Sequence, residues 1–170
     1  RVYDGSTSAA VSSWGSLSGV VGGETVTLVT TGATASFASK NVGPWTVTAA
    51  GLTLGGVDAG NYTLTQPTDT SAITAKGLTV TGFASDDRVY DGSTNAAVSG
   101  WGSLSGTVVG EAVTVVTTGA TASFASKNVG SWTVTAAGLT RGGGDAGNYT
   151  LTQPTDTSAI TAKGRTVTVG

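Results

Sequence analysis

Three carboxylates stand close together near the middle of this 170-residue sequence, at Asp86, Asp87 and Asp91. Calcium prefers oxygen ligands, and an ion held there would stiffen the chain on either side of it. The spacing does not match a calcium-binding loop, so a solvated linker is the other interpretation. We expect no other metal and no cofactor.

A catalytic Ser or Thr would need a base beside it, and the sequence offers none. It contains no His and no Ser-x-x-Lys arrangement, so no hydroxyl is prepared for nucleophilic attack. The glycine-rich stretch GGGDAGN at 142–148 lacks the Lys-Ser/Thr of a phosphate-binding loop, and it precedes a predicted strand instead of a helix. We therefore predict that the protein is not an enzyme.

Two other patterns would allow covalent chemistry. The sequence Asn-Tyr-Thr, at Asn61 and again at Asn148, is a glycosylation sequon. An internal isopeptide bond from Lys40 would need an Asn on a facing strand, for which Asn61 is better placed than the adjacent Asn41. Both are hypotheses beside a simpler interpretation, in which these residues close turns.

Trp14 and Trp45 offer a third kind of chemistry, because exposed indole rings can stack against sugars. Trp45 alternates with Val47 and so belongs to a predicted core, whereas Trp14 precedes Gly15 and fits either role. A carbohydrate-binding module is therefore the alternative to a purely structural one.

Charge and hydropathy exclude several classes of partner. The net charge is −2, and the few Lys and Arg residues are scattered singly, which leaves no basic surface for nucleic acid. No apolar run approaches the roughly 20 residues of a membrane span. The sequence has no Cys, so disulfides do not report on the compartment. We expect that any export signal lies outside this segment.

The elements that must position these residues come as a repeat. Aligned with itself at an offset of 87 residues, the chain is identical at 71 of the first 81 positions. That period is too long for a solenoid and suits a small independent domain. We predict modules at 1–82 and 88–170, joined by a linker at 83–87. The strand at 77–82 could belong to either module.

Apolar residues alternate with Thr and Ser along each repeat, for example in ETVTLVTT and ATASFAS, and this period of two is typical of half-buried strands. We expect about seven short strands per module, in the first at 9–14, 25–31, 33–38, 45–50, 61–65, 70–75 and 78–82, with a weaker one at 1–4. The expected core is Val26, Leu28, Phe37, Trp45, Val47, Tyr62 and Leu64. The fold class is all-β, with two tandem β-sandwich modules of Ig-like or Greek-key type and a β-grasp-like mixed sheet as the alternative.

Differences between the repeats suggest which positions are exposed. Leu54 corresponds to Arg141, and Leu78 corresponds to Arg165. Because an unpaired buried charge is costly, we expect both positions to be exposed or at a strand end.

Two short motifs have the composition of tight turns. Tyr packing beside an Asp-Gly turn indicates a structural corner, and Asp and Asn side chains close turns by bonding the local backbone. These turn residues are Tyr3, Asp4, Gly5, Tyr90, Asp91, Gly92, Asp58, Asn61, Asp145 and Asn148.

The motifs YDG at 3–5, KNVG at 40–43 and DAGNYTL at 58–64 closely resemble the YDG repeat. That module occurs in tandem in very large secreted bacterial surface proteins, including those related to filamentous haemagglutinin. The resemblance covers essentially both repeats. It implies a passive segment of an extracellular fibre or adhesin stalk at the bacterial cell surface, serving adhesion or biofilm formation. It implies no catalytic residues, and a host or matrix glycan would be bound through the parent protein.

The second copy of the strand at 77–82 raises a question of partners. If 77–82 is the first strand of the second module, then the first module lacks the equivalent strand. The copy at 164–169 then has no module to which it belongs. Strand addition would satisfy the backbone groups of both. We expect this assembly strand to pair with the first module of another copy, or to be continuous with it, head-to-tail. Its residues are Gly164, Arg165, Thr166, Val167, Thr168 and Val169.

Overall fold

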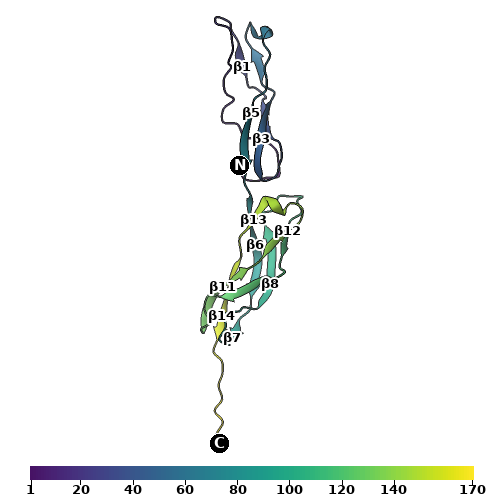
Figure 1. Ribbon diagram of the computed structural model, residues 1–170. Coiled ribbons are helices and arrows are strands. Elements are labelled where there is room, and N and C mark those ends of the chain that lie inside the picture. Colours follow the sequence, from purple (N-terminus) through teal and green to yellow (C-terminus); the bar gives the residue numbers. More distant parts are fainter. The chain divides into compact units, whose positions relative to one another are not determined.

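The computed structural model describes all 170 residues and consists of strands with two single-turn 3-10 helices. The all-β class is therefore confirmed. The chain divides into two compact units, Arg1–Thr74 and Ala75–Gly170, which we call unit 1 and unit 2 (Figure 1). No helix is long and apolar enough to cross a membrane.

Unit 1 contains two small antiparallel sheets. In the first, β3 (Gly43–Ala50) lies between β2 (Thr34–Phe37) and β5 (Thr68–Ile73). In the second, β1 (Thr27–Val29) pairs with β4 (Thr53–Gly55). A 3-10 turn, η1 (Ala59–Asn61), follows β4. The buried apolar residues are Tyr3, Ala35, Phe37, Ala49, Leu52 and Ile73.

Unit 2 has three sheets, two of which are mixed. The first has the order β10-β11-β14-β7, the second pairs β12 with β9, and the third has the order β13-β6-β8. The pairs β14–β7 and β13–β6 are parallel. The elements are β6 (Lys76–Ser85), β7 (Arg88–Val89), β8 (Val98–Ser105), β9 (Thr114–Val116), β10 (Thr121–Phe124), β11 (Gly130–Ala137), β12 (Thr140–Gly142), η2 (Ala146–Asn148), β13 (Tyr149–Leu151) and β14 (Thr155–Thr161).

One hydrophobic cluster joins the two larger sheets of unit 2. It includes Phe83 from β6, Phe124 from β10, Val134 from β11 and Ile160 from β14, with Trp101 of β8 packed against it. The two sheets therefore pack on one another and share a core.

Strand β6 differs from the expectation in two respects. Residues 83–85 were expected in a linker, but they continue β6, and Phe83 is 9% exposed. Leu78 was expected to be exposed or at a strand end because its counterpart is Arg165. It is the third residue of β6 and is 0% exposed, so the expectation of exposure is wrong. Its backbone pairs with Leu151 of β13, and β8 pairs along the other edge of β6. Leu78 is therefore in the central strand of its sheet.

The expected strands of unit 1 were found in part. Those predicted at 25–31, 33–38, 45–50 and 70–75 correspond to β1, β2, β3 and β5, and β4 was missed. Those predicted at 9–14 and 61–65 do not form in unit 1, although their counterparts in unit 2 contribute to β8 and β13. Of the expected core, Phe37 is buried. Half-buried are Val26, Leu28, Trp45, Val47, Tyr62 and Leu64.

Candidate functional site

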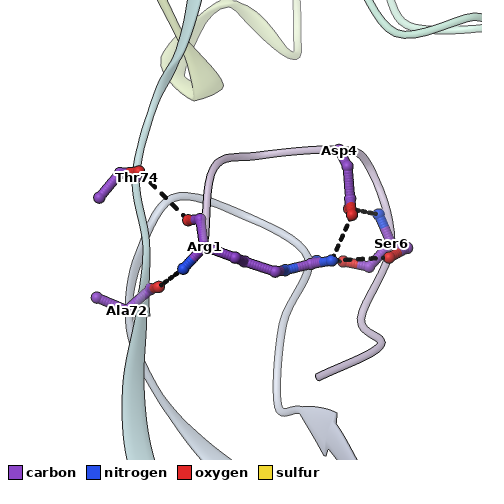
Figure 2. A network of polar contacts seen from close by, with 5 residues as sticks. All are labelled: Arg1, Asp4, Ser6, Ala72 and Thr74. Atoms are coloured by element: carbon purple, nitrogen blue, oxygen red, sulfur yellow. Dashed lines mark hydrogen bonds and ion pairs between the residues drawn. The ribbon is translucent and has the colours of Figure 1, made fainter. Parts of the chain in front are cut away.

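The Tyr-Asp-Gly corner of unit 1 is tied together by Arg1 (Figure 2). The Arg1 guanidinium donates to Asp4 Oδ2 at 2.5 Å, to Ser6 Oγ at 3.0 Å and to the carbonyl of Ser6. Asp4 Oδ1 accepts the N–H of Ser6 at 2.9 Å. That backbone hydrogen bond is the main cause that lowers the pKa of Asp4 below its ordinary value of 3.8. The Asp4 carboxylate and the two terminal nitrogens of the Arg1 guanidinium are therefore engaged in holding the shape of the corner.

The same corner recurs in unit 2 around Arg88. Its guanidinium donates to Asp91 Oδ2 at 2.8 Å, and it lies 5.1 Å from the ring centre of Phe124, as Arg1 does from Phe37. A cation over an aromatic face is attractive at this distance. Because Tyr3 is 1% exposed, the tyrosine of the first corner offers no surface to a ligand.

The second turn motif also bonds to its own unit. Asp58 Oδ2 accepts the N–H of Thr25 at 2.7 Å, and Asp145 Oδ2 accepts that of Ala112 at 2.9 Å. Asn148 is buried, whereas its counterpart Asn61 is exposed. The exposed amide is the more accessible of the two sequons, and its exposure does not suit a buried isopeptide bond with Lys40.

Two of the three carboxylates considered for calcium are engaged by other partners. Asp87 Oδ1 accepts the N–H of Ala159 at 2.6 Å, and Asp91 is held by Arg88 and by the N–H of Ser93. No group of three or more acidic or other metal-binding side chains is placed to hold an ion. The geometry therefore offers calcium no assembled site.

The two tryptophans of unit 1 occupy different surroundings. Trp45 lies on β3, where its indole N–H donates to the carbonyl of Asn41 at 2.7 Å. Trp14 lies outside any strand and borders two neighbouring hollows of about 470 and 430 Å³. Around the first hollow are Leu17, Val26, Leu28, Leu64 and Pro67, and around the second Phe37, Val47, Asp69 and Ser71. Unit 1 thus has a groove, formed by these two hollows, with apolar walls and a polar edge.

In unit 2, β6 pairs with the strands that carry the counterparts of Trp14 and Leu64. The ring of Phe83 lies 5.9 Å from that of Trp101, the counterpart of Trp14. Tyr149 is 1% exposed, whereas its counterpart Tyr62 is only half-buried. The pKa of both tyrosines is raised above its ordinary value. The main cause is burial for Tyr149 and a hydrogen bond to Glu24 for Tyr62. The difference reflects the covering strand.

The end of β6 is fastened by a small polar cluster. Ser85 donates to Asp156 Oδ2 through its N–H at 2.8 Å and through its hydroxyl at 3.0 Å. The hydroxyl of Ser158, which is 4% exposed, lies 2.7 Å from that of Ser85 and 3.0 Å from the Ser85 carbonyl oxygen. These bonds hold the end of β6 against β14 of the neighbouring sheet.

This cluster predicts a pH dependence. The bond from the Ser85 N–H is the first cause that lowers the pKa of Asp156 below 3.8. A carboxyl with a lowered folded pKa stabilises the fold above its unfolded pKa, and that stability is lost as the pH falls through the folded value. Below about pH 4 we expect the melting temperature of unit 2 to fall less in Asp156→Asn than in the wild type. An equal fall in both would contradict the assignment, and Asp69→Asn is the control in unit 1.

Sequence reasoning missed Phe83 and Ser85 because the segment 83–87 looked like a joint, and it missed Ser158 because its partner Ser85 lies in that segment. The signal was weak. Gly82 has a φ of +78°, and the alternation of buried positions in β6 changes phase there, so that Leu78, Val80 and Phe83 all contribute to the interior. A strict period of two does not place Phe83 with Leu78. The aromatic residue after a glycine was the available clue.

Comparison with known proteins gives one result. The family model described as YDG domain matches residues 1–71 and 74–159. No curated protein and no solved structure matches the chain.

Proposed function

The chain belongs to the YDG domain family, and on that premise we propose that it is a non-catalytic structural segment of an extracellular bacterial fibre or adhesin stalk. Its repeats would supply length and stiffness in adhesion or biofilm formation. Each copy would associate with the next head-to-tail. A host or matrix glycan would be bound elsewhere in the parent protein.

The observation that carries this proposal is the unequal completion of the two repeats. In unit 2, β6 pairs with β8 and β13. In unit 1 the counterparts of β8 and β13, residues 11–18 and 62–64, form no strand, and the groove beside them is open. Residues 164–169, which correspond to residues 77–82 of β6 with Arg165 in place of Leu78 and Val169 in place of Gly82, are exposed and belong to no strand. Unit 1 has an open edge where unit 2 has β6, and residues 164–169 correspond to part of β6 but are unpaired. This favours strand addition between copies.

The sandwich arrangement is part of the same proposal. The shared core of the two larger sheets in unit 2 supports two sheets packed face to face. We propose the same arrangement for unit 1 once a strand has been added to it. A contact between two different surfaces does not close on itself, so it generates filaments.

Deletion of residues 164–170 tests the self-association. We expect the sedimentation coefficient of the full chain to rise with concentration, and that of the shortened chain to stay at the monomer value. The deletion removes exposed residues only, so both units should keep their melting temperatures. Equal assembly of the two proteins would exclude residues 164–169 as the connecting strand.

A carbohydrate-binding module is the second candidate, favoured by the position of Trp14 at the rim of an open groove. A glycan array would separate the two functions. Saturable binding that is lost in Trp14→Ala would support the second candidate. If no glycan binds, the carbohydrate-binding function is excluded and the structural function is the one that remains.

A further inference from the structure

We propose that the groove of unit 1 is a binding site for a β-strand that carries the side-chain pattern of residues 76–85, with Leu, an aromatic residue and Ser at fixed positions. The partner is a polypeptide strand of this repeat type. The inference rests on the proposed function, because it concerns the same groove, and it adds what the groove demands of its occupant.

The first demand is for two apolar anchors. In unit 2, Leu78 pairs with Leu151, and Phe83 pairs with Trp101. The counterparts of those two partners in unit 1 are Leu64 and Trp14, which border the first hollow, and Trp14 also borders the second. Two apolar hollows therefore lie where unit 2 receives the two anchor side chains.

The second demand is for close approach of a backbone. A Cβ atom placed on Gly102 would lie 2.3 Å from the carbonyl oxygen of Thr81, so β6 runs directly over this glycine. Gly15, its counterpart in unit 1, has nearly the same backbone angle, with φ of +79° against +74°, but no atom within 4 Å of such a Cβ. Gly15 therefore has the backbone conformation that allows a strand to approach in unit 2, and the space over Gly15 is free.

The third demand is for a hydrogen-bonding residue at the strand's end. Ser85 satisfies Asp156 and Ser158 in unit 2. Their counterparts in unit 1, Asp69 and Ser71, are exposed and border the second hollow. A serine on the incoming strand would reach both and would hold the end of the strand, as Ser85 does in unit 2.

The segment 164–169 of the chain meets these demands only in part. Val167 matches Val80, but Arg165 stands in the position of Leu78, and Gly170 stands in that of Phe83. Exchanging a buried Leu for Arg and removing an aromatic ring both lose apolar burial. The groove should therefore prefer the sequence of residues 76–87 to that of residues 163–170.

A labelled peptide with the sequence of residues 76–87, KGLTVTGFASDD, tests the proposal on the full chain. We expect saturable binding in fluorescence anisotropy, with one peptide per chain because β6 already fills the site in unit 2. The matched peptide KGRTVTGGASDD, which lacks both anchors, should bind at least about tenfold more weakly. Absence of binding, equal affinity of the two peptides, or two bound peptides per chain would each overturn the proposal.

Two variants of the protein locate the site. Trp14→Ala should weaken peptide binding by about tenfold or more, whereas Trp45→Ala, which removes an indole that does not border the groove, should leave it unchanged. If Trp14→Ala unfolds unit 1, Asp69→Ala at the exposed polar edge replaces it and should also weaken binding. Equal affinity of the wild type and the groove variants would contradict this location.

The result is separable from that of the deletion experiment. Peptide binding by chains that do not associate would refute head-to-tail assembly and leave the strand-binding groove standing. If the chain assembles through residues 164–170 but does not bind the peptide, the strand-binding groove is refuted and head-to-tail assembly stands.

Discussion

Replacing Phe83 with Ala should lower the free energy of unfolding of unit 2 by about 3–5 kcal/mol, the usual cost of removing a buried aromatic side chain. Phe83 is part of the core cluster of unit 2, and its ring packs against that of Trp101. The measurement is denaturant unfolding of the full chain, followed by tryptophan fluorescence. The transition of unit 1 should not move.

Val167→Ala is the control for this experiment, because Val167 is the exposed counterpart of Val80 in the segment outside unit 2's sheets. We expect it to change stability by less than about 0.5 kcal/mol, as for most surface substitutions. A loss below about 1 kcal/mol for Phe83→Ala, small for a buried aromatic, would mean that residues 83–87 act as the linker that the sequence suggests.

Replacing Phe37 with Ala should have an effect of similar size in unit 1, about 3–5 kcal/mol. Phe37 is buried on β2 and lies beneath the guanidinium of Arg1. Since each unit has its own buried residues, we expect an early melting step for unit 1 while unit 2 stays folded. Differential scanning calorimetry would resolve the two steps.

The repeat supplies the matched variant for that experiment. Phe124 is the counterpart of Phe37, with the same guanidinium contact from Arg88. Phe124→Ala should shift the transition of unit 2 and leave that of unit 1 in place. One cooperative transition that moves as a whole in either variant would show that the units do not unfold independently.

Alternation in the sequence was sufficient to predict most of the strands whose partners lie within the same repeat. The predictions at 33–38, 45–50 and 70–75 agree with β2, β3 and β5, which pair with one another. The short β4 was missed because three residues give too little alternation to recognise. The alternation of apolar and polar residues can therefore predict a strand when its pairing partner lies in the same repeat.

Residues 62–64 show why the rest could not be predicted. They have the same sequence, Tyr-Thr-Leu, as residues 149–151, yet only the second copy forms a strand. The difference is β6, which pairs with β13 in unit 2. A strand needs a partner for its backbone groups, and a single-sequence pattern does not say whether that partner is present.

The burial of Leu78 was mispredicted for a related reason. Comparing it with Arg165 assumes that both copies occupy the same environment. Leu78 lies between two strands, whereas Arg165 is exposed and pairs with nothing in its own chain. Sequence identity between the repeats therefore showed that they share an architecture. It did not show which copy of a strand is paired and buried.

Electron microscopy of the purified full chain over a range of concentrations tests the account most directly. If the assembly strand of one copy completes unit 1 of another, the images should show unbranched filaments that lengthen with concentration. Monomers of uniform size at every concentration would contradict head-to-tail assembly as the function of this chain.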